Sequence, residues 1–139
     1  KRQFIIEKKH SRNDMDLESI DGEHKFHVFF RIHNEFQENF SIGLASIPKD
    51  GTPRITLLRC NGPHGEHTSD PIVYEPHVSY HIHKATADNI NIGARPEREA
   101  EITHEYGTFE EAVSVFLNKC NIKGADKYFP YSRQLRLDF

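Results

Sequence analysis

Residues 25–33 read Lys-Phe-His-Val-Phe-Phe-Arg-Ile-His. Side chains point alternately to the two sides of a β-strand. One side of this stretch carries four apolar side chains: Phe26, Val28, Phe30 and Ile32. The other side carries His27, Arg31 and His33, and only Phe29 interrupts its polar character. The pattern predicts a strand that buries one side in a core and presents polar side chains on the other.

The same alternation recurs along the first hundred residues. It predicts further strands over residues 4–7, 40–47, 54–60, 78–84 and 101–106. The pairs Asp21-Gly22 and Asp50-Gly51 stand between apolar runs and are typical of hairpin turns. A curved antiparallel sheet of about five to seven strands, in which successive strands are neighbours, follows from this pattern.

One helix is predicted over residues 108–121. Thr108 and Glu111 form a capping-box pattern, in which the hydroxyl and the carboxylate satisfy the first backbone N–H groups of a helix. Apolar residues then recur at helical spacing: Phe109, Ala112, Val113, Phe116, Leu117 and Cys120. This apolar stripe predicts that the helix packs on one face of the sheet, which makes the fold class α+β.

The 139 residues are expected to form a single domain, because this length supports one hydrophobic core. Residues 1–22 are expected to form a basic arm and a polar loop. Five Lys and Arg lie among residues 1–12, and the loop is expected over residues 8–22. The aromatic tail, residues 123–139, is expected to dock as a last strand or to contact a partner chain, which is consistent with a homodimer.

Charge and cysteine content exclude several functional classes. The net charge of −3 gives no global attraction to nucleic acid or to an anionic membrane, and no apolar run is long enough to span a bilayer. Cys60 and Cys120 are far apart in the chain and are not in a C-x-x-C arrangement, which favours a reducing, cytoplasmic setting. Cys60 lies two positions after Leu58 and therefore on the same side of the strand, so it is expected to be buried. No dinucleotide, P-loop, serine-hydrolase or zincin motif is present.

Histidine is the unusual residue of this chain. There are ten, and five of them fall within residues 64–83. In the strand predicted near residue 80, the odd positions share one side: His77, Ser79, His81 and His83. A preceding strand that ends in a turn carries more polar side chains towards one end of the sheet: Arg59, Asn61, His64 and His67.

Two kinds of chemistry suit imidazoles near a guanidinium. Without a cofactor, His64, His77, His81 and His83 would supply a general acid and a general base, Arg59 would bind a phosphate, and Asn61 would orient a ligand oxygen. RNA cleavage by attack of its own 2′-hydroxyl group needs only these groups.

The other chemistry is metal binding. His81 and His83 would bind a divalent metal such as Zn²⁺, with His77, His64 or His67 as the third ligand. A carboxylate could join them from Glu66, Asp70 or Glu75. A third interpretation is that the histidines only cover the solvated face of a half-buried sheet.

The segment Arg59-Cys-Asn-Gly-Pro-His64, followed by Pro76-His77 and by His81 and His83, resembles the TumE family of small bacterial toxins. The resemblance covers residues 54–122, and the family's motif falls on Arg59, Asn61, Pro63, His64, Pro76, His77 and the following H-x-H. It also extends to uncharacterised bacterial and phage proteins. It implies nucleolytic activity and a helix-turn-helix antitoxin as partner.

Taken together, the sequence predicts a toxin-like, metal-independent ribonuclease that requires no cofactor. The alternative is a non-catalytic phage or host-defence interaction module, whose histidines form a surface for a protein partner or a metal. RNA or a protein is the expected partner in these two hypotheses, and a membrane is not.

Overall fold

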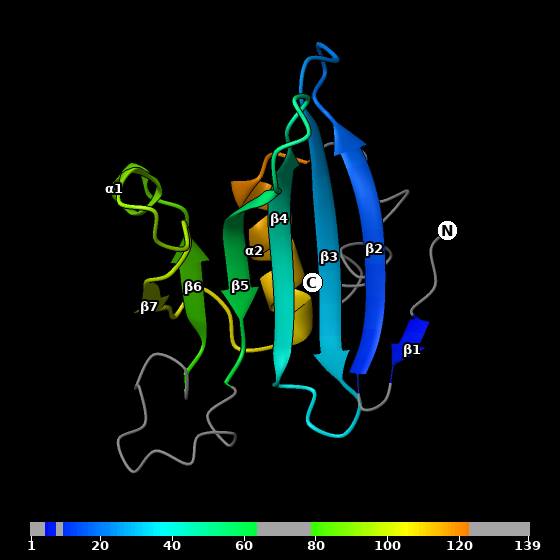
Figure 1. Ribbon diagram of the computed structural model, residues 1–139. Coiled ribbons are helices and arrows are strands. Elements are labelled where there is room, and N and C mark those ends of the chain that lie inside the picture. The colour runs from blue at the N-terminus through cyan, green and yellow to red at the C-terminus, as the bar shows by residue number, and fades with distance from the viewer. Residues whose placement is uncertain (1–4, 8–9, 64–78, 123–139) are drawn as a thin grey trace.

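The computed structural model describes residues 5–7, 10–63 and 79–122. Seven strands form one antiparallel sheet, and their order in the sheet is their order in the chain (Figure 1). The strands are β1 (Ile5–Glu7), β2 (His10–Glu18), β3 (Lys25–His33), β4 (Phe40–Ile47), β5 (Ile55–Asn61), β6 (His81–Lys84) and β7 (Ala100–Ile102). The α+β fold with a curved antiparallel sheet is therefore confirmed.

The two predicted hairpin turns lie where the sequence places them. Gly22 joins β2 to β3 with a φ of 76°, and Gly51 joins β4 to β5 with a φ of 80°. Residues with a Cβ rarely adopt such positive angles, whereas glycine does so at little cost. In both turns the preceding aspartate accepts a hydrogen bond from a backbone N–H two residues further on.

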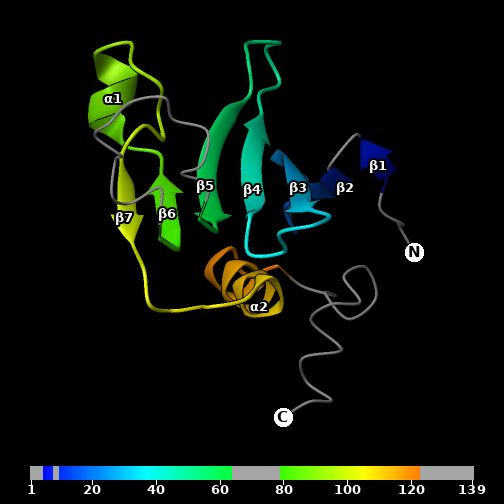
Figure 2. The same ribbon diagram turned by 90° about the horizontal axis from the view of Figure 1, so that it is seen from below.

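Helix α2 (Phe109–Lys119) lies across one face of the sheet, as predicted (Figure 2). The hydroxyl of Thr108 accepts a hydrogen bond from the N–H of Glu111, and this interaction caps the first turn. The apolar stripe of α2 is buried against the sheet, with the ring of Phe116 6.3 Å from that of Phe30. Cys60 is fully buried in the same core. Burial of each large apolar side chain contributes about 1.5–3 kcal/mol.

The prediction of a polar loop over residues 8–22 is wrong for most of its length. Residues 10–18 form β2, which pairs along all nine positions with β3. The inward side of β2 carries Asn13, Met15 and Leu17, so only two of these positions are apolar and the alternation is weak. Pairing with the strongly patterned β3 supplies the order that the local sequence does not show.

Two smaller differences lie near the other edge of the sheet. The last strand, β7, ends at Ile102 rather than at residue 106, because Tyr106 turns into the core and donates hydrogen bonds to the carbonyls of Asn61 and His81. A short helix that was not predicted, α1 (Ala87–Asn91), lies between β6 and β7. It sits on the side of the sheet away from α2 (Figure 2). The aromatic tail lies outside the described residues.

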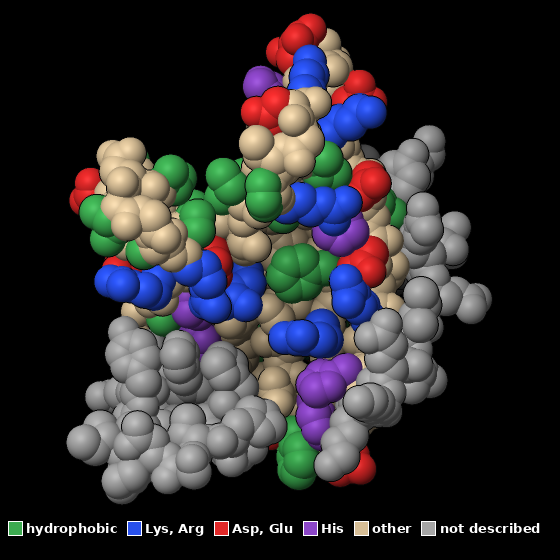
Figure 3. All heavy atoms as spheres, viewed as in Figure 1, with side chains coloured by type: hydrophobic (Ala, Val, Ile, Leu, Met, Phe, Trp, Pro, Cys, Tyr) green, Lys and Arg blue, Asp and Glu red, His purple; other side chains and the backbone are tan. Residues whose placement is uncertain are grey.

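The face of the sheet opposite α2 is here called the polar face. Among the described residues no helix lies across its centre, and Figure 3 shows Lys, Arg and His side chains around a small hydrophobic area over the middle strands. The registers of β2 to β6 assign these residues to it: His10, Arg12, Asp14, Asp16, His27, Phe29, Arg31, His33, Ser41, Gly43, Ala45, Arg59, Asn61, His81 and His83.

Candidate functional site

The structure brings four of the predicted site residues together on the polar face. Arg59 and Asn61 lie at the end of β5, and His81 and His83 lie on the neighbouring strand β6. The register pairs Asn61 with His81 and Arg59 with His83. Two imidazoles of one strand therefore lie beside the Arg59 guanidinium, and the predicted site with four histidines stays a prediction. His64, His77 and His67 lie outside the described residues, as do the three candidate carboxylate ligands.

Both imidazoles are fixed by backbone carbonyl groups. Nδ1 of His81 lies 2.8 Å from the carbonyl oxygen of Ser79, and Nδ1 of His83 lies 2.9 Å from that of Glu97. Because a carbonyl can only accept, Nδ1 carries the proton in each ring, and in the neutral ring Nε2 carries the lone pair. The ring centres are 5.1 Å apart, and the two residues are 0% and 2% exposed.

Asn61 contacts His81 rather than solvent. Its Oδ1 accepts a hydrogen bond from the hydroxyl of Ser41 at 2.7 Å, which fixes the orientation of the amide. The amide nitrogen then lies 3.4 Å from Nε2 of His81. Three neighbouring strands thus carry a chain of polar contacts from Ser41 through Asn61 to His81. In this arrangement Asn61 positions the imidazole.

Arg59 is held by a carboxylate that no sequence motif indicates. Its Nη2 lies 3.2 Å from Oε2 of Glu97, and Arg95 binds the other oxygen of the same carboxylate at 3.0 Å. Glu97 is 5% exposed, whereas the Arg59 side chain keeps 22% of its surface exposed. Glu97 therefore supplies its carboxylate to Arg59 and its carbonyl to His83.

Arg59 lies near two further arginines and one carboxylate. Burial is the largest influence on its guanidinium and lowers the pKa, Glu97 raises the pKa, and the nearby Arg95 and Arg31 lower it to a smaller extent. Its Nε is buried and has no hydrogen-bond partner among the described residues. Arg95 and Arg31 repel the partly buried guanidinium of Arg59, and a bound phosphate would relieve this repulsion.

The segment after α1 places Glu97. The N–H of Thr86 donates to the carbonyl of Pro96, and the buried Asn89 donates to the same carbonyl from its side chain. The hydroxyl of Thr86 also caps α1. The sequence around Glu97 is a run of alternating charges, which is typical of a solvated surface. Only the tertiary structure reveals its role.

The other histidines of the polar face lie on β2 and β3, separated from β6 by β4 and β5. At a strand spacing of about 4.8 Å, His27 and His33 lie roughly 14 Å from the β6 strand. His33 is used in a turn, since its Nδ1 accepts hydrogen bonds from the N–H groups of Glu35 and Phe36 at 3.1 Å. These histidines share a face with His81 and His83 but not a site.

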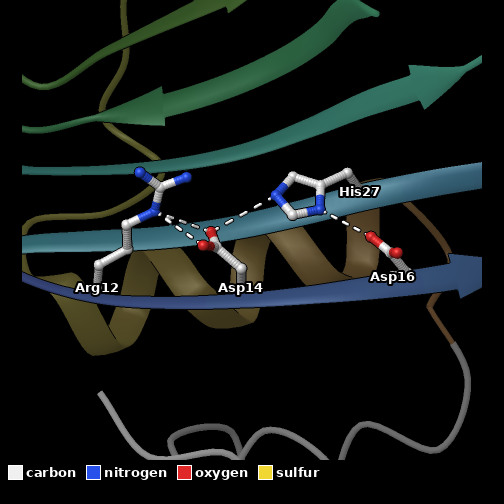
Figure 4. A network of polar contacts seen from close by, with 4 residues as sticks. All are labelled: Arg12, Asp14, Asp16 and His27. Atoms are coloured by element: carbon white, nitrogen blue, oxygen red, sulfur yellow. Dashed lines mark hydrogen bonds and ion pairs between the residues drawn. The ribbon is translucent and has the colours of Figure 1, made fainter. Parts of the chain in front are cut away.

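His27 belongs to a network of polar contacts that runs along β2 (Figure 4). Its Nδ1 lies 2.8 Å from Asp16, and its Nε2 lies 3.5 Å from Asp14. Asp14 also binds Nε of Arg12 at 2.9 Å. This network places one imidazole between two carboxylates, so it stabilises the pairing of β2 with β3 and neutralises Arg12.

Within residues 5–7, 10–63 and 79–122, no group of three or more His, Cys, Asp or Glu side chains is arranged to hold a metal ion. The part of the chain that the structure describes also contains no helix long and apolar enough to cross a membrane. In comparisons with known proteins, no family model, curated protein or solved structure matches this chain.

Proposed function

We propose that this protein cleaves single-stranded RNA without a metal, at the site formed by Arg59, His81 and His83. The observation that carries the proposal is the register of β5 and β6, which places Arg59 directly opposite His83 and Asn61 opposite His81. The two imidazoles are 5.1 Å apart, a separation at which both can act on one phosphodiester.

The chemistry is an intramolecular transesterification. One neutral imidazole accepts the proton of the RNA 2′-hydroxyl through Nε2, and the 2′-oxygen attacks the adjacent phosphorus. The other imidazole, in its protonated form, donates a proton to the departing 5′-oxygen as the P–O5′ bond breaks. The products are a 2′,3′-cyclic phosphate and a 5′-hydroxyl group, so no water is consumed. Arg59 stabilises the charge on the phosphoryl oxygens.

The resemblance of residues 54–122 to the TumE toxins supports this proposal. In that setting the cleavage would stop the growth of the host cell, and a helix-turn-helix antitoxin would block the site. We therefore propose an antitoxin or another protein as the natural partner, and the cytoplasm as its location.

Cleavage of a labelled single-stranded RNA in the presence of EDTA tests the function. The protein should be purified without a histidine tag. We expect His81→Gln and His83→Gln each to lower the rate by a factor of about 10² to 10⁴, which is the usual contribution of a general acid or base. His104→Gln is the matched control, because His104 is exposed and is not among the partners of Arg59, Asn61, His81 or His83 described above. Equal rates in all four proteins would refute the proposal.

A second function is favoured by the burial of the two imidazoles. Rings that are 0% and 2% exposed, with Nδ1 bound to a carbonyl, resemble the histidines of metal sites, whose outer nitrogen is held in this way. In that case His81 and His83, together with His77, would bind a divalent metal such as Zn²⁺ in a non-catalytic interaction module. Calorimetric titration with Zn²⁺ tests this alternative, which requires saturable binding that His83→Gln abolishes.

A further inference from the structure

Phe29 is the one apolar interruption on the polar side of β3, and the cleavage site makes no use of it. We propose that Phe29 is a stacking platform for a base of single-stranded RNA, on a binding surface that extends from Arg31 and Phe29 across Gly43 to Arg59. This inference rests on the proposed function and adds a contact of the single-stranded substrate outside the cleavage site.

The sheet is built to hold the Phe29 ring on the polar face. Phe29 and Gly43 are cross-strand partners, and the ring lies above the glycine backbone. A Cβ atom at position 43 would lie 2.2 Å from Cζ of Phe29, so only glycine leaves room for the ring. Phe29 is half-buried, and part of its ring therefore remains exposed on this face.

Asp14 is the partner of Phe29 on β2, whereas cationic side chains lie along β3 and towards β5. Arg31 is exposed and lies two positions along β3 on the same face, while Arg59 is the partner of Gly43 on the next strand. Among the described residues, the ion pairs of this face involve Arg12, Arg59 and Arg95 but not Arg31. The Lys and Arg side chains form a band around a small hydrophobic area over the middle strands (Figure 3).

An aromatic ring with arginine side chains nearby is suited to unpaired nucleotides. Every base has a π-face that can stack on an aromatic ring, and guanidinium groups bind the phosphates between bases. A duplex cannot use the ring, because its bases are already stacked inside the helix. One cross-strand row contains Phe29, Gly43, Arg59 and His83 in this order. A strand of RNA that crosses the sheet along this row would lead from the stacked base to the cleavage site.

A tryptophan at position 29 provides a direct probe, because the chain contains no tryptophan. The probe ligand is a short 2′-O-methyl oligouridylate, which cannot be cleaved by attack of a 2′-hydroxyl group. We expect it to quench the fluorescence of Phe29→Trp in a saturable manner, and we expect a duplex of the same length not to do so. Ile20→Trp is the control, since Ile20 is 93% exposed in the turn between β2 and β3.

Phe29→Leu tests the same point in case tryptophan distorts the sheet. With a fluorescent oligouridylate, we expect roughly a ten- to hundredfold loss of affinity, in line with the usual contribution of base stacking on an aromatic ring. Thermal unfolding identifies any loss of folded protein. Affinity unchanged in folded Phe29→Leu, or equal quenching by duplex and single strand, would overturn the inference.

The outcomes separate this inference from the proposed function. Binding through Phe29 without cleavage of natural RNA would contradict the ribonuclease and retain the surface. Cleavage that Phe29→Leu leaves unchanged, in both KM and kcat, would retain the ribonuclease and contradict the surface. Binding of a protein partner, but of no oligonucleotide, would contradict the surface as an RNA site.

Discussion

The backbone carbonyl of Glu97 lies 2.9 Å from Nδ1 of His83, and the carboxylate of the same residue lies 3.2 Å from Nη2 of Arg59. One residue between α1 and β7 therefore orients both the candidate proton-transfer group and the candidate phosphate ligand. Glu97 is a positioning residue, because it acts on the substrate only through its neighbours.

Replacement of the charge tests this role. Glu97→Gln keeps the carbonyl that holds His83 but leaves Arg59 partly buried without its counter-ion. We expect a loss of about 1–2 kcal/mol in the free energy of unfolding, below the usual cost for a fully buried pair because Arg59 and Arg95 retain exposure. Urea denaturation measures this loss, and Glu101→Gln on β7 is the exposed control. Equal stability of the two variants would show that Glu97 does not hold Arg59.

The contact of Gly43 with Phe29 predicts a coupled pair of substitutions. Gly43→Ala introduces a Cβ atom 2.2 Å from the ring and should destabilise the fold by about 1–3 kcal/mol, as overpacking usually does. Addition of Phe29→Leu should recover part of this loss, since the smaller side chain can move aside. A double-mutant cycle of thermal unfolding measures the coupling. Strictly additive effects would show that the two residues do not interact.

Asp14 is expected to weaken RNA binding in the natural protein. It neutralises Arg12 and contacts His27 on the polar face (Figure 4). Asp14→Asn should therefore raise the affinity for an oligouridylate at low salt, and the gain should shrink as salt is added, because screening weakens exposed charges. Stability should fall by less than about 1 kcal/mol, since these ion pairs are partly exposed. Fluorescence anisotropy at several salt concentrations measures the effect, and a lower affinity would contradict the expectation.

Cys60 predicts how stability depends on alkaline pH. Burial raises the pKa of this thiol from 9.0 to about 12, since the charged thiolate is unfavourable in the core. The unfolded chain loses the proton at lower pH than the folded protein does. The contribution of Cys60 to the free energy of unfolding is therefore fully present below pH 9.0 and declines as the pH rises from there towards about 12.

The Cys60→Ala variant should show a shallower decline in the free energy of unfolding over this range. Urea denaturation at a series of alkaline pH values measures the slope. The neutral thiol should also resist alkylation in the folded protein. An unchanged slope in the variant, or rapid alkylation of native Cys60, would show that the thiol is not protected.

The sheet could be predicted because the sequence of β3 contains strong alternation and the turns contain Asp-Gly pairs. Residues such as Val28 and Phe30 are buried and so must be apolar, and this requirement is visible in the sequence. Strand β2 has no such signal, because pairing with β3 stabilises it more than its own apolar side chains do. Helix α1 has five residues, too few to produce a periodic pattern.

The candidate site was predictable only in part. His81 and His83 are two positions apart, which predicts that they share one side of a strand. Their pairing with Arg59 and Asn61 depends on the register between β5 and β6, which a long connection joins. The contribution of Glu97 has no local signal, because a charged residue between two arginines is typical of an exposed loop. The spacing between β3 and β6, which excludes His27 and His33 from the site, is also a tertiary property.

The most direct test of the account is the product formed from an oligonucleotide that contains one ribonucleotide among 2′-O-methyl nucleotides. The protein is free of metal, EDTA is present, and mass spectrometry identifies the ends. We predict one cut, directly after the ribonucleotide, with a 2′,3′-cyclic phosphate and a 5′-hydroxyl group, and no cut with His83→Gln. An intact oligonucleotide, or a product with a 5′-phosphate, would contradict the assignment of Arg59, His81 and His83 to RNA cleavage.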